Sequence, residues 1–233
     1  MTPRPPVRDG GALCLAIALL LAQARVAPWP STLAEAASAA SPADAPALLE
    51  TLRSASPAER RAAAAGLGEV GDARAVDGLA RALHDPDTGV RQAASDALWA
   101  VWSRSGDPAV DALFRQGVEL MSAQRLAEAV DVFGEVIRRA PGFAEGWNKR
   151  ATVYYLMGAL DRSLADCEEV IRLNPIHFGA LSGFGLIYLR KDDPARAADY
   201  FARALAVNPG LDQVRAALEE IRAVLAERRK QSI

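Results

Sequence analysis

Histidine and cysteine are both scarce in this chain, with two of each among 233 residues. His84 and His177 lie far apart in sequence, so no pair of histidines has the spacing of metal ligands. The motifs of a nucleophilic serine (GxSxG), a phosphate-binding loop, a CxxC pair and an HExxH zinc site are also missing. A missing motif does not by itself exclude an enzyme, but the sequence predicts no catalytic residue, no cofactor and no metal site.

An excess of either charge is missing too. Lys and Arg number 27 against 29 Asp and Glu, which leaves a formal net charge of −2. This balance provides no long-range field to attract nucleic acid or an anionic membrane. A composition that is 51% hydrophobic and 24% charged is typical of a soluble globular protein. We therefore expect a local binding surface for a protein or peptide partner, no nucleic-acid partner, and a monomer.

The apolar run at the N-terminus is too short to cross a membrane. It extends from Ala12 to Ala22, follows Arg4 and Arg8, and precedes small residues at Ala22-Gln23-Ala24. These three regions are typical of a secretory signal peptide, so residues 1–24 are predicted to be cleaved and the protein to be secreted, in a bacterial periplasm. After cleavage no stable membrane insertion is expected. An uncleaved membrane anchor is the alternative.

Residues 25–45 are rich in Ala, Ser and Pro, with few large apolar residues. Such a segment buries too little apolar area to offset the entropy of ordering its backbone. It is predicted to be a flexible linker.

What the chain does contain is a repeat of 34 residues, marked by Pro141, Pro175 and Pro209. The same step relates the small residues Gly117, Ala151 and Gly185. A fixed period of this length with two helical patterns in each unit predicts stacked helical hairpins. The pattern resembles the tetratricopeptide repeat (TPR) family, with three units at 110–143, 144–177 and 178–211, within a region that spans 106–211.

A shorter repeat of 31 residues precedes it. Apolar, small and arginine positions recur at this step in residues 46–105, as Leu48, Leu52, Arg60, Ala62, Ala63 and Leu67 and then as Leu79, Leu83, Arg91, Ala93, Ala94 and Leu98. This region resembles HEAT-like repeats of the short kind also found in phycobilin lyases. The resemblance covers the helical pairs alone, and nothing here resembles a lyase active site.

The two repeat series have similar sequences where they meet. Gly71-Asp72 reappears as Gly106-Asp107, and the helix that follows each is alike, so the first helix of the 34-residue series is expected to stack as the next HEAT-type helix. Residues 212–233 continue with an apolar stripe that predicts a capping helix and a tail. The predicted fold class is all-α, an α-solenoid of helix-turn-helix repeats, HEAT-like and then TPR, that form one right-handed superhelix with a C-terminal capping helix.

Several residue pairs are expected to touch inside the array. Arg150 and Asp166 occupy positions whose counterparts in the third unit are Phe184 and Tyr200, which predicts an ion pair in one unit and a ring pair in the next. Cys167 is predicted to be a core residue rather than a reactive thiol, because its counterparts at the 34-residue step are phenylalanines. Trp99 and Trp102 are expected to pack at the junction of the two series rather than to stack on a ligand.

The TPR resemblance also implies a binding surface, the concave face lined by the first helix of each unit. Family members that clamp a C-terminal carboxylate place Lys and Asn where this chain has Phe114 and Val118, so that clamp is not expected. Carried over position by position, the protein-binding groove contains Asp111, Phe114, Val118, Met121, Glu145, Asn148, Thr152, Tyr155, Ser182, Leu186, Leu189 and Arg190.

The sequence therefore favours an exported TPR/HEAT scaffold or adaptor, not an enzyme, that binds a protein or peptide of the cell envelope. Two alternatives remain open. One is a lyase-like enzyme or enzyme subunit that uses the HEAT-like region. The other is a membrane-tethered assembly factor with an uncleaved leader.

Overall fold

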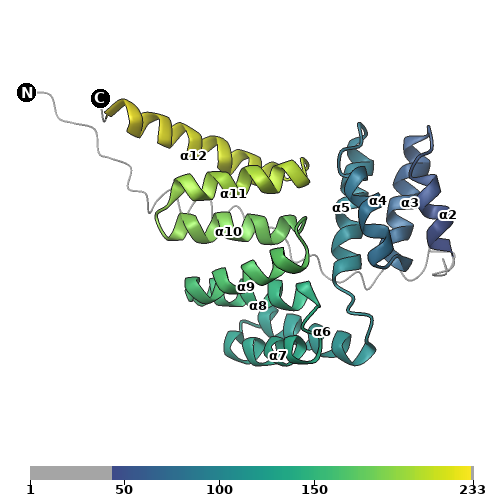
Figure 1. The fold of residues 1–233 in the computed structure, drawn as a ribbon, viewed down its shortest axis with the longest axis horizontal. Helices are drawn as coiled ribbons and strands as arrows, with labels where there is room; N and C mark the ends of the chain where they lie inside the picture. The colour runs from purple at the N-terminus through teal and green to yellow at the C-terminus, as the bar shows by residue number, and fades with distance from the viewer. Residues whose placement is uncertain (1–43, 232–233) are drawn as a thin grey trace, which may run out of the picture.

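The described part of the chain, residues 44–231, folds into helices without a strand in a computed structural model (Figure 1). The predicted signal peptide and nearly all of the predicted linker lie outside these residues. None of the described helices is long and apolar enough to cross a membrane. The predicted all-α solenoid is confirmed. Its elements are α2 (Ala45–Thr51), α3 (Pro57–Val70), the 3-10 turn η2 (Ala73–Ala75), α4 (Val76–Ala82), α5 (Thr88–Trp102), α6 (Pro108–Ser122), α7 (Leu126–Arg139), α8 (Ala144–Leu156), α9 (Leu160–Leu173), α10 (Phe178–Arg190), α11 (Pro194–Val207) and α12 (Asp212–Gln231).

The 34-residue units form three helical hairpins, α6/α7, α8/α9 and α10/α11, and each hairpin packs on the next. The turn after the first helix of each hairpin contains a residue in the left-handed region, two positions beyond the end of the helix. These residues are Gln124 at φ 59°, Gly158 at φ 77° and Asp192 at φ 56°. A left-handed residue just beyond the helix turns the chain so that the second helix can run back along the first. Glycine suits this position at Gly158, because it adopts positive φ without a steric penalty.

A small residue and a larger one fit together inside each hairpin. A Cβ atom on Gly117 would lie 2.6 Å from the Phe133 ring, and one on Gly185 would lie 2.4 Å from the Phe201 ring. The second hairpin has alanine and Cys167 at these two places, so a larger first residue is matched by a smaller second one. Burial raises the pKa of the Cys167 thiol to about 12, which leaves it protonated and unreactive at neutral pH. Cys167 is the core residue that the sequence predicts.

The two predicted pairs between helices are also confirmed. Arg150 donates two hydrogen bonds of 2.8 Å to the two carboxylate oxygens of Asp166. In the third unit the Phe184 and Tyr200 rings stack with their centroids 4.4 Å apart and their planes 15° apart. The same two positions therefore hold their hairpin together by charge in one unit and by ring stacking in the next.

The repeated arginine of the HEAT-like region has the same role in both copies. Arg60 Nη1 donates to the carbonyl oxygen of Ser54 at 2.9 Å, and Arg91 Nη1 donates to the carbonyl oxygen of Asp85 at 2.8 Å. Each arginine thus ties a helix to the turn that precedes it. Arg60 also makes a two-bond ion pair with the Asp85 carboxylate, at 2.7 and 2.8 Å, which links α3 to the turn before α5.

The expected stacking of α6 on α5 is wrong. Among the described residues, the apolar cluster of α5 contains no residue of α6, and that of α6 contains none of α5. Instead α5 packs on Ile176 and Phe178 at the start of α10, so α2 to α5 stand beside one edge of the array with their axes across it (Figure 1). The physical reason is the aromatic face of α5. Its Trp99 and Trp102 rings pack on the Phe178 ring of α10 rather than on α6.

The last helix closes the other end of the array. α12 packs on α11 and buries Val214, Leu218 and Ile221, with Leu225 partly covered. Its acidic and basic residues lie on the outer face, as the apolar stripe predicts. The predicted C-terminal capping helix is confirmed.

Candidate functional site

The predicted groove residues lie on the first helices of the three hairpins, α6, α8 and α10, but they do not form one open surface. Phe114, Met121 and Leu189 are buried, at 4%, 5% and 5% exposure. Phe114 packs edge-on against Phe143 and Met121 shares its apolar cluster, so both belong to the core of the first unit. These three residues are corrections to the predicted groove, because a buried side chain offers no surface to a partner.

Asp111 has a local role at the start of α6. Its Oδ1 accepts hydrogen bonds from the Ser105 backbone N–H at 2.8 Å and from the Ser105 hydroxyl at 2.6 Å. The carboxylate therefore fixes the turn that leads into the array. It is half-buried in the first turn of α6, and its place in the groove stays a prediction.

Glu145 and Asn148, on the first two turns of α8, are polar yet buried, at 0% and 8% exposure. Asn148 Nδ2 donates to Glu145 Oε2 at 3.0 Å, and His177 Nε2 lies 2.9 Å from the same oxygen. Lys149 Nζ lies 3.0 Å from Glu145 Oε1 as an ion pair. This polar cluster of four residues, Glu145, Asn148, Lys149 and His177, joins α8 to the start of α10. Because Glu145 and Asn148 are buried in it, they are also corrections to the predicted groove.

The hydrogen bonds of the polar cluster fix the tautomer of His177. The Ala180 backbone N–H donates to His177 Nδ1 at 3.1 Å, so Nδ1 is the unprotonated nitrogen and Nε2 carries the proton that is donated to Glu145. The imidazole thereby caps the N-terminus of α10. Complete burial favours the protonated form of Glu145, but the charge of Lys149 and the hydrogen bond from His177 outweigh it and hold the pKa of this carboxyl below its ordinary value.

Two tryptophans of α5 cover the polar cluster. The Trp102 ring stacks on His177, with centroids 4.6 Å apart and planes 22° apart. The Trp99 ring meets His177 edge-on at 5.4 Å, and Lys149 Nζ lies 5.5 Å from its centroid. The prediction that both tryptophans pack at a junction is confirmed, and the junction joins α5 to α8 and α10.

Sequence reasoning missed His177 and Lys149 as parts of this junction. One signal was present for His177. The residue before the first helix of each later unit or of the cap is Phe143, His177 or Leu211 at the 34-residue step, so a polar ring stands where its counterparts are apolar. A polar residue at an apolar position of a repeat indicates a special contact there.

The predicted groove residues that stay open are spread along the first helices, with Tyr155 and Arg190 at their C-terminal ends. Arg190 is exposed, its Nη1 donates to the Tyr155 carbonyl oxygen at 2.7 Å, and its guanidinium lies 4.8 Å from the Tyr155 ring centroid. Thr152 and Ser182 donate their hydroxyl protons to carbonyl oxygens of their own helices, at 2.9 and 2.8 Å, so they offer only acceptor lone pairs to a partner. The open residues are Val118, Thr152, Tyr155, Ser182, Leu186 and Arg190.

Two residues that follow Tyr155 in sequence are exposed, and the sequence analysis did not predict them. Leu156 and Met157 are 45% and 49% exposed, and they are the exposed large hydrophobic residues of the described part of the chain. They follow Tyr155 directly at the end of α8. We refer to Tyr155, Leu156, Met157 and Arg190 as the open patch.

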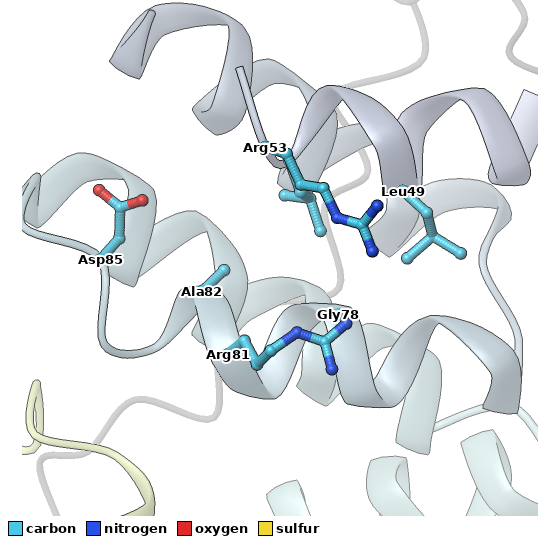
Figure 2. Close-up of a pocket in the computed structure, with 7 residues that line it drawn as sticks. Leu49, Arg53, Gly78, Arg81, Ala82 and Asp85 are labelled. Atoms are coloured by element: carbon cyan, nitrogen blue, oxygen red, sulfur yellow. The ribbon is translucent and has the colours of Figure 1, made fainter. Parts of the chain in front are cut away.

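A separate pocket lies between α2 and α4 in the HEAT-like region. Figure 2 shows Arg53 and Arg81 extending into one space beside Leu49, while Asp85 lies apart from both guanidinium groups. Two hydrogen bonds from Arg60 hold the pKa of the Asp85 carboxyl below its ordinary value, so this group stays ionised and occupied. The pocket therefore supplies no acid and base that converge on one point.

Within residues 44–231 no group of three or more metal-binding side chains is close enough to hold an ion.

Comparisons with known proteins agree with this architecture. A HEAT-repeat model matches residues 45–133, and a tetratricopeptide-repeat model matches residues 114–177 and 148–212. The HEAT-repeat match continues through α6 and part of α7, which reflects the sequence likeness at the meeting point of the two series, although the packing breaks there.

Similar proteins carry the same repeats. A TPR repeat-containing protein of Rhizobium etli is 32% identical over 108 residues, which are 46% of this chain and 53% of that protein. The Hsp70-Hsp90 organizing protein of Triticum aestivum is 28% identical over 110 residues, 46% of this chain and 19% of that protein. The chain thus spans about half of the first relative's length and a fifth of the second's.

Among solved structures, the Sgt2 TPR domain from Aspergillus fumigatus is similar in fold. Its TM-score is 0.51 at 22% identity, over 53% of this chain and 83% of that domain. The fold and the matches together define an all-α repeat protein. Its C-terminal array consists of tetratricopeptide repeats, and HEAT repeats precede them.

Proposed function

We propose that this protein is a binding scaffold whose TPR array holds a protein or peptide partner at the open patch. The observation that carries the proposal is the exposure of Leu156 and Met157 beside Tyr155 and Arg190. Exposed large apolar residues on a surface mark interaction sites. Tyrosine and arginine are enriched among the residues that contribute most to binding.

Comparison with relatives supports the class of partner. The Triticum relative is named as an organizing protein of Hsp70 and Hsp90. The carboxylate clamp of some TPR family members is not matched here, because Phe114 and Val118 stand in place of its Lys and Asn and Phe114 is buried against Phe143. The proposed partner is therefore recognised through apolar and aromatic contacts at the open patch rather than through a C-terminal carboxylate.

Binding at the open patch predicts the behaviour of a Leu156→Ser, Arg190→Ala double variant. Because both side chains are exposed at the end of their helices, the melting temperature should hardly change. Partner affinity should fall by about 10- to 100-fold, the loss typical of removing one or two hot-spot residues. Partner captured by crosslinking in an envelope extract, then purified and titrated against each variant, gives the measurement.

A matched control is Arg162→Ala. Arg162 lies over the neighbouring Tyr154 ring at 5.7 Å, so it is an arginine on a tyrosine of the same hairpin but outside the open patch. Full affinity is expected for the control. Equal affinities of the double variant and the control would reject the open patch.

We also propose that the protein is exported to the cell envelope, and the support is the leader pattern of residues 1–24. N-terminal sequencing of the exported protein should then give Arg25 as the first residue. Recovery of intact Met1 in a membrane fraction would contradict cleavage and favour the tethered alternative.

A further inference from the structure

The α5 helix of the HEAT-like region covers the edge of the array where the predicted groove residues Glu145 and Asn148 lie. The open patch lies at the C-terminal ends of α8 and α10, and the N-terminal ends of the same helices are covered by α5. Trp99 lies against the start of α10 so closely that a Cβ atom on Gly179 would be 2.3 Å from its Cη2. Lys149 and His177, each covered by an α5 tryptophan, hold Glu145 beneath them. Helix α5 of the same chain therefore covers the place where the predicted groove contains Glu145 and Asn148.

The link between α5 and the array has the features of a hinge. Arg104 is tied back to the HEAT-like region, because its guanidinium donates to the carbonyl oxygens of Gly68 and Gly71 at 2.8 and 2.6 Å. Ser105, the next residue, is tied forward to Asp111 of α6. Gly106 follows with φ at +86° and with no atom near the place of its absent Cβ. The bonds of Ser105 to Asp107 and Asp111 cross Gly106 and hold it in the turn, so the backward and forward sets of bonds meet at the Arg104–Ser105 linkage, where rotation breaks neither set.

The interface that α5 makes is mixed in character. Trp99, Trp102 and Phe178 supply apolar contact, while Ser95 accepts a hydrogen bond of 3.1 Å from Asn208 and the polar cluster lies below. The buried Trp102 Nε1 atom has no hydrogen bond among the described residues. Interfaces within one chain that mix polar and apolar groups permit relative motion unless they are large and hydrophobic.

We propose that α5 is a built-in occupant of the TPR groove, and that the HEAT-like region rotates at the Arg104–Ser105 linkage to uncover the N-terminal half of the face formed by α8 and α10. The uncovered half accepts a helical segment with two aromatic side chains three residues apart, since this is the chemistry of its own occupant. Docking of α5 thereby limits the partner to the open patch. The inference that α5 limits partner binding rests on the proposed function. The inferences that α5 occupies the groove and that the HEAT-like region rotates at the hinge do not.

A Gly179→Ala variant tests the occupancy from the side of the array. Alanine suits a helix better than glycine, but its Cβ would collide with the Trp99 indole, which Lys149, Trp102 and Phe178 enclose. Gly183→Ala, one turn further along α10, is the matched control. Its Cβ would lie 3.6 Å from the Cys167 sulfur, an ordinary contact.

Opening can be followed with spin labels on Glu69→Cys in α3 and Glu219→Cys in α12, in a chain that also carries Cys14→Ser. Cys167 stays unlabelled, because its thiol is buried and protonated. We expect a single narrow distribution of distances between the two labels for the chain without a groove substitution and for Gly183→Ala. For Gly179→Ala and for a Trp99→Ala, Trp102→Ala double variant, we expect a broader distribution at longer distances. The hinge is overturned if both altered proteins keep the narrow distribution.

A synthetic peptide with the sequence of residues 88–103 tests what the covered half binds. A fluorescent form of it should bind the Trp99→Ala, Trp102→Ala chain about tenfold or more tightly than the wild-type chain, where the tethered α5 competes at high effective concentration. The same peptide with both tryptophans changed to alanine should not bind. Equal affinity of the tryptophan peptide for both chains overturns the occupancy.

The outcomes separate this proposal from the proposed function. Peptide binding and opening should be unchanged by Leu156→Ser, Arg190→Ala, which acts on the open patch alone. If opening does not raise affinity for the captured partner while the open-patch variant still lowers it, the regulatory role is rejected and the proposed function stands. If the open-patch variant binds fully, the proposed function fails, and the occupancy and the hinge are judged by the labels and the peptide.

Discussion

Replacing Phe201 with alanine is expected to lower the free energy of unfolding by roughly 3–5 kcal/mol, the usual cost of removing a buried aromatic ring. Phe201 is fully buried, and its ring lies where Gly185 leaves out a Cβ atom. Glycine has no side chain that could move into the space, so the cavity stays open. Chemical denaturation followed by far-UV circular dichroism measures the change.

Two further variants make this prediction specific. Asp199→Ala, an exposed change on the same helix, should hardly affect the denaturation midpoint. Gly185→Ala combined with Phe201→Cys recreates the alanine and cysteine pair of the second hairpin, so its cost should be smaller than the sum of the two single changes. Additive costs, or a Phe201→Ala cost below about 1 kcal/mol, would contradict the proposed fit between the small and the large residue.

The contacts within hairpins were predictable from the sequence because a repeat places equivalent residues in equivalent surroundings. Gly117 with Phe133 and Gly185 with Phe201 recur at one step, and Ala151 with Cys167 changes both members together. Two exceptional pairs, Arg150 with Asp166 and Phe184 with Tyr200, vary in the same compensating way. A compensating change between units identifies residues that touch, and this information lies wholly within the period.

The groove was only partly predictable, since a repeat pattern describes how units stack and not what lies across them. Glu145 and Asn148 occupy positions that face outward in an isolated array. They are buried because Lys149 and His177 lie over them and the tryptophans of α5 lie over those in turn. α5 belongs to the other repeat series and runs across the array, so neither the 31-residue nor the 34-residue step encodes the contact.

The break between α5 and α6 was hidden for a related reason. Gly71-Asp72 and Gly106-Asp107 are alike in sequence, and both aspartates accept a hydrogen bond from a backbone N–H two residues later. The similar local caps predict similar helix starts, and these exist. They do not specify the path of the chain before the cap, which the left-handed Gly106 and the carbonyl contacts of Arg104 decide.

Replacing Glu145 with alanine is expected to destabilise the docked protein by about 3 kcal/mol, near the lower end of the cost of breaking a buried charge pair. The change leaves the buried His177 Nε2–H without its acceptor and Asn148 without its partner. Lys149 keeps 21% of its side chain exposed and can turn to water, which limits the loss. Glu128→Ala, an exposed partner of Arg125, should hardly change stability and is the control.

The same carboxylate gives the protein a distinct response to acid, which Glu145→Gln isolates. Lys149 and His177 keep the folded pKa of Glu145 below its ordinary value despite its burial, so the ionised form stabilises the fold above that ordinary value, near pH 4.5. This contribution declines as the pH falls below 4.5 and is lost as the pH passes through the folded pKa. The glutamine variant has no proton to gain, so its stability should decrease less steeply with acid than that of the wild type. Denaturant midpoints measured from pH 7 to pH 3 decide this, and parallel curves for the two proteins would show that Glu145 is not the charge that holds α8 to α10 beneath the tryptophans of α5.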